Sequence, residues 1–182
     1  MKKFLFVKVF VVFLALFGFS YGVSAQDEAF SKGDKVVQLG IGIGSYIDWA
    51  GYSTKFPLIS GSFEFGILDL LNDKAAIGVG GYLAYTSFGY KGDSNWSISD
   101  LIVGPRAAFH YQFMEKLDTY AGLMIGYDVV SYGQKDANLS GSGFTSSWYI
   151  GARYYFTSSI AIFGELGYGI APLELGISYK FY

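Results

Sequence analysis

The last ten residues of the chain, Leu173-Glu174-Leu175-Gly176-Ile177-Ser178-Tyr179-Lys180-Phe181-Tyr182, alternate between two kinds of side chain almost to the end. Leucine, isoleucine, tyrosine and phenylalanine occupy one phase, while charged, small and hydroxyl side chains occupy the other. Because successive side chains of a β-strand point to opposite faces, this stretch predicts a strand with one bulky apolar face and one polar face.

The same two-residue period recurs in seven earlier segments, separated by residues typical of turns. The eight predicted strands cover residues 35–45, 58–68, 75–89, 98–113, 119–131, 144–156, 160–169 and 173–181. Most are close to or above the roughly 9–11 residues that a tilted strand needs to cross a bilayer. Strands of soluble proteins are usually only about five or six residues long.

The two phases of these strands differ sharply in charge. One phase holds Val37, Leu39, Ile41, Ile43, Ile59, Gly61, Phe63, Phe65, Ile67, Ile77, Val79, Gly81, Leu83, Tyr85, Leu101, Val103, Pro105, Ala107, Phe109, Tyr111, Phe113, Ala121, Leu123, Ile125, Tyr127, Val129, Trp148, Ile150, Ala152, Tyr154, Phe156, Ile160, Ile162, Gly164, Leu166, Tyr168, Leu173, Leu175, Ile177, Tyr179 and Phe181. None of these is charged, although charged residues make up 15% of the chain. The opposite phase holds Glu64, Arg106, His110, Asp128, Arg153, Glu165, Glu174 and Lys180, together with many glycines.

This polarity decides the fold class. A soluble ligand-binding barrel would point its bulky apolar side chains inward, whereas here the charges must share the inside and the apolar phase must face lipid. The sequence therefore predicts an all-β protein, a transmembrane antiparallel up-and-down β-barrel of eight strands. Pro105 lies within one predicted strand, and because it has no N–H to donate, we expect a bulge or a ladder break there.

The connections alternate in length, as expected for such barrels. Short links are predicted around residues 72–73, 115–116 and 157–159, and longer polar loops at 46–57, 90–97 and 132–143. The final link, near residues 170–172, is short where a long loop was due. Tyrosine, tryptophan and phenylalanine gather near the ends of the apolar rows, which is typical of aromatic girdles at the two membrane interfaces.

The first 25 residues are predicted to be a cleaved signal peptide. Lysines at positions 2, 3 and 8 precede an apolar run, residues 9–19, that is too short to span a membrane as a helix. Val23-Ser24-Ala25 then provides the small residues that a signal peptidase requires. Residues 26–34 are expected to form a short periplasmic leader and 35–182 the barrel.

Composition excludes several classes of function. The whole chain has a net charge of −2, and loss of the signal peptide would remove three lysines and no acid, so a nucleic-acid partner is not expected. The chain contains no cysteine and a single histidine, which argues against disulfides, thiolate sites and a tight transition-metal site. We expect no cofactor and no bound metal.

The apolar alternation that ends on aromatic residues resembles the signal read by the barrel-assembly machinery of Gram-negative outer membranes. Here the signal consists of Leu173, Leu175, Ile177, Tyr179, Phe181 and Tyr182. The motif departs from the usual pattern because Phe181 keeps the apolar phase and Tyr182 follows it.

The mature chain as a whole resembles the small eight-stranded outer-membrane barrels of the OmpX and OmpA transmembrane-domain type. That resemblance implies a filled interior, periplasmic termini, contact with outer-membrane lipid, and roles in envelope integrity, adhesion or interaction through outer loops.

The inward charges are the candidate site. Glu64, Arg106, Asp128, Arg153, Glu165, Glu174 and Lys180 are expected to form an interior network, with Arg153 in reach of Glu165. Buried charges must be paired, so a structural plug is favoured over a narrow conduit or gate. His110 has no Ser neighbour in the pattern of a lipid-modifying enzyme, and an interior hydrogen-bonding role is favoured over a catalytic one.

The sequence thus favours a non-enzymatic, integral protein of the cell outer membrane, structural or acting through its extracellular loops on a sugar or protein partner. The alternatives are a narrow channel for small solutes or ions and, less favoured, a lipid-modifying enzyme. The sequence identifies no ligand.

Overall fold

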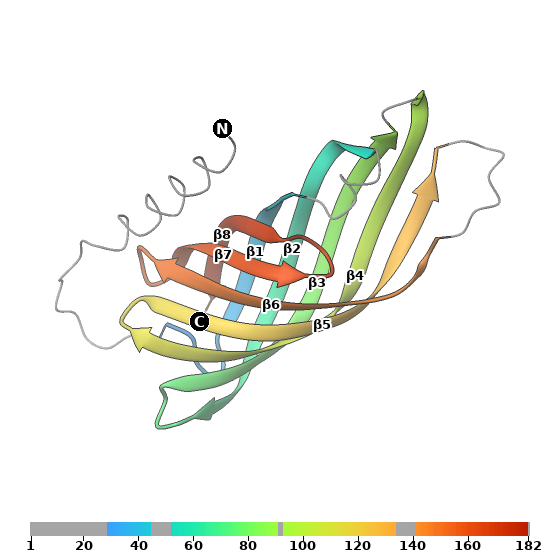
Figure 1. The fold of residues 1–182 in the computed structure, drawn as a ribbon. Helices are drawn as coiled ribbons and strands as arrows, with labels where there is room; N and C mark the ends of the chain where they lie inside the picture. Colours follow the sequence, from blue (N-terminus) through green and yellow to red (C-terminus); the bar gives the residue numbers. More distant parts are fainter. Residues whose placement is uncertain (1–28, 45–51, 91–92, 134–140, 182) are drawn as a thin grey trace.

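The computed structural model describes residues 29–44, 52–90, 93–133 and 141–181, and in them eight antiparallel strands close into a barrel (Figure 1). Each strand pairs with its neighbours in sequence, and β8 closes the ring against β1. The strands are β1 (Lys35–Ile43), β2 (Tyr52–Leu70), β3 (Ala75–Tyr90), β4 (Asp93–Met114), β5 (Leu117–Tyr132), β6 (Gly143–Tyr155), β7 (Ile160–Tyr168) and β8 (Leu173–Phe181). The predicted fold class is confirmed, while the predicted signal peptide lies outside the described residues.

One end of the barrel, called the terminal end below, holds the start of β1, the end of β8 and three tight turns. The predicted turns near 72–73, 115–116 and 157–159 all fall between strands, as expected. Leu71, Asn72 and Asp73 have positive φ angles of 56°, 54° and 66°. Asn and Asp enter this left-handed region more readily than most residues, which explains the turn at this point.

At the opposite end, called the loop end, two of the predicted loops are shorter than expected because strands begin inside them. The region 46–57 was expected to be irregular, but β2 already begins at Tyr52, and β4 begins at Asp93 inside the expected loop 90–97. Their polar side chains do not prevent pairing, because the ladder is made by backbone groups: Ser53 pairs with Gly89, and Gly89 pairs with Ser97 on its other side.

The wall of the barrel is consequently uneven. Strand β4 has 22 residues and β2 has 19, whereas β1, β7 and β8 have nine each. Figure 1 shows β2 to β5 running well past the turn that joins β7 to β8. These four strands form a sheet that projects beyond the closed part of the barrel.

The outward face is apolar, as the alternation predicts. Leu123 and Ile125 on β5 each expose 65% of their surface, and Leu39, Leu83 and Ile150 are also exposed. Glu64, Arg106, Arg153 and Glu165, on the alternate phase, are buried inside. Among the described residues no helix is long and apolar enough to span a membrane.

Aromatic side chains ring both ends of the apolar face. At the terminal end, the alternate strands β4, β6 and β8 each carry an edge-to-face pair of one tyrosine and one phenylalanine, namely Tyr111–Phe113, Tyr154–Phe156 and Tyr179–Phe181. At the other end of the apolar face, Trp148 and Tyr168 stack with ring centroids 6.5 Å apart. Amphipathic rings of this kind favour the depth of lipid headgroups.

Pro105 interrupts one ladder without a bulge. On the β3 side it pairs in register with Gly81, but the ladder between β4 and β5 has no pairs between Val103↔Tyr127 and Arg106↔Met124. The predicted ladder break is therefore present on the β5 side only, and the register on either side of it is unchanged.

Candidate functional site

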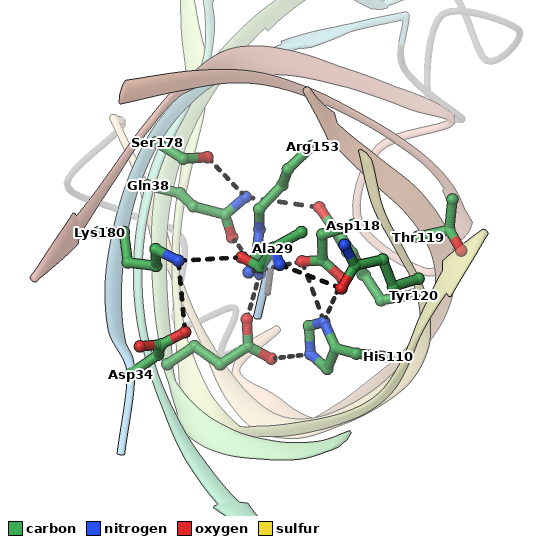
Figure 2. Close-up of polar contacts among 12 residues, drawn as sticks. Ala29, Asp34, Gln38, His110, Asp118, Thr119, Tyr120, Arg153, Ser178 and Lys180 are labelled. Atoms are coloured by element: carbon green, nitrogen blue, oxygen red, sulfur yellow. Dashed lines mark hydrogen bonds and ion pairs between the residues drawn. The ribbon is translucent and has the colours of Figure 1, made fainter. Parts of the chain in front are cut away.

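The interior of the barrel at the terminal end holds a cluster formed by Glu64, His110, Asp118 and Arg153, called the Arg153 cluster below. Arg153 Nη1 donates to Oδ2 of Asp118 at 3.1 Å, and Nη2 donates to Oε2 of Glu64. The four side chains come from β2, β4, β5 and β6, so the cluster crosses the lumen (Figure 2). Their side chains are at most 2% exposed, and a buried charge is tolerated only when it is fully paired.

His110 lies between the two acids of this cluster. Its Nε2 is 2.9 Å from Oε1 of Glu64, and its Nδ1 is 2.9 Å from Oδ1 of Asp118. An ionised carboxylate can only accept hydrogen bonds, so both ring nitrogens must donate, which is the pattern of an imidazolium. Two cations then balance two carboxylates, and the Arg153 cluster is neutral overall.

Aromatic rings and an amide complete the surroundings of Arg153. Its guanidinium carbon lies 4.5 Å from the ring centroid of Tyr120 and 5.5 Å from that of Phe30. Gln38 lies beside it, donating to Ser178 and accepting from Ser62 at 3.0 Å. Planar guanidinium stacks well on aromatic faces, so these contacts hold Arg153 in the orientation that both acids require.

A glycine makes room for Glu64. Gly78 on β3 pairs with Gly66 rather than with Glu64, but a Cβ atom on it would lie 2.6 Å from Oε1 and 2.9 Å from Cδ of the Glu64 side chain. The small residues of the inward phase therefore admit the long charged side chains of neighbouring strands.

A second group of charges, the Arg106 cluster, lies nearer the loop end and consists of Arg106, Tyr120, Tyr149 and Glu165. Arg106 donates from Nη2 to Oε1 of Glu165 at 2.8 Å and from Nε to the hydroxyl of Tyr149 at 2.9 Å. The Tyr120 hydroxyl donates to the same Oε1 of Glu165 at 2.8 Å. Tyr120 thus touches both clusters and joins them into one network.

Glu174 is a second carboxylate beside the Arg106 cluster. It pairs in register with Glu165 across β7 and β8, and it accepts from the hydroxyl of Tyr82 at 2.9 Å and from that of Ser60. A cavity of about 30 Å³ adjoins Arg106, Glu165 and Glu174 below the link between β7 and β8. This volume is enough for one or two water molecules.

Residues 29–34 close the terminal end of the lumen. Phe30 stacks on the imidazole of His110 with centroids 4.1 Å apart, and the backbone N–H of Ala29 donates to Oε1 of Gln112 at 3.2 Å. Lys180 holds the segment from β8, with its Nζ 3.5 Å from Oδ2 of Asp34 and 3.5 Å from the carbonyl oxygen of Ala29 (Figure 2). The described part of the expected leader therefore lies across the end of the barrel.

The structure distributes six of the seven predicted network residues over three places and leaves Asp128 apart from them. Glu64 and Arg153 lie in one cluster, Arg106 and Glu165 in the other with Glu174 beside them, and Lys180 contacts residues 29–34. Arg153 was expected to lie within reach of Glu165, but the structure pairs it with Glu64 and Asp118 instead. Asp128 is half-buried, and its Oδ1 has no hydrogen-bond partner among the residues that the structure describes.

Sequence reasoning missed Asp118, Gln38 and Asp34, and it left His110 outside the network. Asp118 shares the inward phase of β5 with Asp128, but that strand was predicted to begin at residue 119, whereas it begins at Leu117, so the prediction left Asp118 out. Gln38 also lies on an inward phase and carries no charge to mark it. No pattern in residues 29–34 predicts their position inside the lumen.

The described residues predicted to form the C-terminal assembly signal lie on β8. Ile177, Tyr179 and Phe181 are exposed on the outward face, with Leu173 and Leu175 half-buried on the same phase, while Tyr182 lies outside the described residues. In the described part of the chain, no group of three or more histidine, cysteine, aspartate or glutamate side chains could hold a metal ion.

No family model matches the sequence, and no curated protein matches it either. Solved structures do match in fold. OprG from Pseudomonas aeruginosa aligns with a TM-score of 0.54 at 11% identity, over 86% of this chain and 100% of its own. The N-terminal β-barrel domain of Pseudomonas aeruginosa OprF aligns at 0.52 and 14% identity, over 84% and 100%.

Ail, the attachment invasion locus protein of Yersinia pestis, aligns with a TM-score of 0.52 at 14% identity, over 82% of this chain and 99% of its own. These similarities concern the whole described barrel rather than one motif, and their low identities make them evidence of fold alone. The chain has the fold of the small eight-stranded outer-membrane β-barrels.

Proposed function

We propose that this protein is a non-enzymatic, integral protein of the Gram-negative outer membrane whose lumen is sealed. The observation that carries the proposal is the network joined by Tyr120, which crosses the lumen from β4 to β7 through Arg106 and Glu165 and from β6 to β2 through Arg153 and Glu64. The apolar outward face and its aromatic ends support the membrane location.

A sealed lumen follows from how completely the charges are paired. A conduit needs polar groups that water can solvate, whereas the Arg106 side chain is 3% exposed and that of Arg153 is fully buried. An eight-stranded barrel is just wide enough to be filled by side chains. Residues 29–34 add a second closure at the terminal end.

The alternative of a narrow channel is tested by conductance in a planar bilayer. We expect the folded protein to be silent, with folding checked by heat-shifted gel mobility. Arg106→Ala and Glu165→Gln should lower the thermal stability and still produce no reproducible current steps. Steps in the unaltered protein that either substitution changes would show a conduit, and the sealed-lumen proposal would fall.

The geometry of His110 bears on the enzyme alternative. A general base needs a free ring nitrogen, and both nitrogens of His110 are engaged by carboxylates, with side chains that are at most 2% exposed. The test is mass analysis of lipid A from cells with and without the protein, in which we expect no difference.

We further propose that the projecting sheet of β2 to β5 is the surface that meets a partner outside the cell. In the described residues, the pairing of β2 with β1 ends at Ile59↔Ile41, so the stretch from 52 to 58 has no neighbour on that side. An unpaired strand edge offers backbone N–H and C=O groups to an extended polypeptide. Phe56 and Tyr85 add exposed rings 5.9 Å apart on the same sheet.

The test is attachment of cells that display the protein to a protein-coated surface. Phe56→Lys should reduce attachment several-fold, because a lysine on an edge strand discourages pairing. Asp73→Lys, in an exposed turn at the opposite end, is the control and should change nothing. Equal attachment by all three proteins would remove the projecting sheet as the partner surface.

The remaining predictions about export belong to this proposal. Residues 1–25 are removed as a signal peptide, 26–34 form a leader on the periplasmic side, and 35–182 insert as the barrel. The β8 signal is read by the barrel-assembly machinery, and both termini stay in the periplasm. Mass spectrometry of the mature protein and protease access from either side of the membrane test these statements.

A further inference from the structure

Asp100 on β4 and Asp128 on β5 form an acidic pair on the inner side of the projecting sheet. In the β4–β5 ladder, Asp100 pairs with Val130 and Asp128 pairs with Ile102, so the two acids are diagonal neighbours on one face. Asp100 is 8% exposed and Asp128 is half-buried. Two exposed tyrosines, Tyr85 on β3 opposite Leu101 and Tyr127 on β5 opposite Val103, place the pair near the aromatic side chains at the loop end of the apolar face.

Each acid has a buried carboxylate oxygen that receives no hydrogen bond from the described part of the chain. Oδ1 of Asp100 and Oδ1 of Asp128 are both buried, and neither has a hydrogen-bond partner. Leaving a buried charged acceptor without a partner is costly, and two neighbouring carboxylates also repel each other. The other interior carboxylates described above all have donors, so this pair differs in kind from the rest of the interior.

We propose that Asp100 and Asp128 bind a divalent cation, Ca²⁺ being the best fit. Hard cations of this class take carboxylate, hydroxyl and water oxygens at about 2.3–2.6 Å, and one ion between diagonal neighbours satisfies both Oδ1 atoms and cancels their repulsion.

A third oxygen is available beside the pair. Thr86 on β3 stands opposite Asp100 in register and is buried like it. Its hydroxyl hydrogen is directed to the carbonyl oxygen of Phe56 at 3.1 Å, which leaves the lone pairs of Oγ1 free to accept or to coordinate. With two carboxylates, one hydroxyl and water as ligands, the site should be weak, with a dissociation constant of roughly 10⁻⁴ to 10⁻³ M.

The alternative explanation for the unpaired oxygens is that one of the two carboxylates carries a proton. If one of the two acids is simply protonated, the pair needs no ion, and Ca²⁺ has no effect. The two explanations differ in what an amide does. Asp100→Asn removes the repulsion in both cases, but only in the cation case does it also abolish a response to Ca²⁺.

The experiment is calorimetric titration of CaCl₂ into the folded full-length mature protein in zwitterionic detergent, after chelation and at matched ionic strength. Thermal melting with and without Ca²⁺ runs in parallel. We expect about one Ca²⁺ per chain, a rise in melting temperature, and a loss of affinity of at least about 10- to 100-fold in Asp100→Asn and Asp128→Asn.

Asp73→Asn is the control, since it makes the same change in an exposed turn whose positive φ suits asparagine. It should bind and respond like the unaltered protein. In chelator, Asp100→Asn should melt at the same temperature as the unaltered protein or higher, which separates loss of a ligand from failure to fold. No binding by the unaltered protein, or equal binding by all four proteins, would overturn the proposal.

Discussion

Arg106 on β4 and Glu165 on β7 form an ion pair across the lumen, with Nη2 and Oε1 2.8 Å apart. The two strands are not neighbours in the sheet, so the pair connects opposite parts of the wall. Its side chains are 3% and 7% exposed. In such a setting the attraction and the cost of desolvation nearly cancel, whereas an orphaned partner is strongly destabilising.

This balance predicts non-additive effects of substitution. Arg106→Met and Glu165→Met should each lower the free energy of unfolding by about 3–5 kcal/mol, and the double variant should lose far less than the sum. Unfolding in urea, followed in lipid vesicles by tryptophan fluorescence, measures all three. As a control, substituting the exposed turn residues Glu115 and Lys116 together should change the free energy of unfolding by no more than about 0.5 kcal/mol. Additive losses would contradict the paired network.

The position of His110 predicts its protonation pattern. Because Glu64 and Asp118 each need a donor, both ring nitrogens should carry hydrogen at pH 7, and the nitrogen-15 spectrum of the imidazole should show two protonated nitrogens. With Asp118→Asn, the side-chain amide can donate to the ring instead, and one nitrogen should lose its hydrogen. A neutral ring in the unaltered protein would contradict the charge balance of the Arg153 cluster.

Two glycines on β3 form a matched pair for the interior packing. Gly78→Ala would place a Cβ 2.6 Å from Glu64 Oε1 and should destabilise the barrel by about 1–3 kcal/mol. Gly81→Ala meets nothing within 4 Å and faces outward, so it should be neutral or slightly stabilising. The same urea assay compares them, and equal effects would show that the glutamate is not held at this place.

The sequence predicted the outward face well because the physical signal is repeated on every strand. Residues such as Leu39, Leu123 and Ile150 must all be apolar because their side chains face lipid. Alternation on eight strands leaves one arrangement in which all of them do so. For the inner face, the sequence predicted which residues point inward but not which of them contact one another.

The choice of partners depends on how far each strand is displaced along its neighbours, which alternation does not reveal. Arg153 meets Glu64 and Asp118 from β2 and β5, and no spacing in the sequence relates these three strands. The projecting parts of β2 and β4 were predicted as loops because their side chains are polar, although backbone pairing is indifferent to that. Phe30 carried no local signal for its place on His110.

The apolar face of this barrel lies in a bilayer, and two leucines with equal exposure test this placement. Leu123 on β5 and Leu71 in the β2–β3 turn are each 65% exposed. The measurement is the free energy of unfolding in lipid vesicles of Leu123→Arg and Leu71→Arg against the unaltered protein. We predict a loss of about 2–4 kcal/mol for Leu123→Arg and of at most about 1 kcal/mol for Leu71→Arg, because the cost of a charge depends on its depth in the membrane. Equal small losses at both positions would contradict a membrane-embedded face.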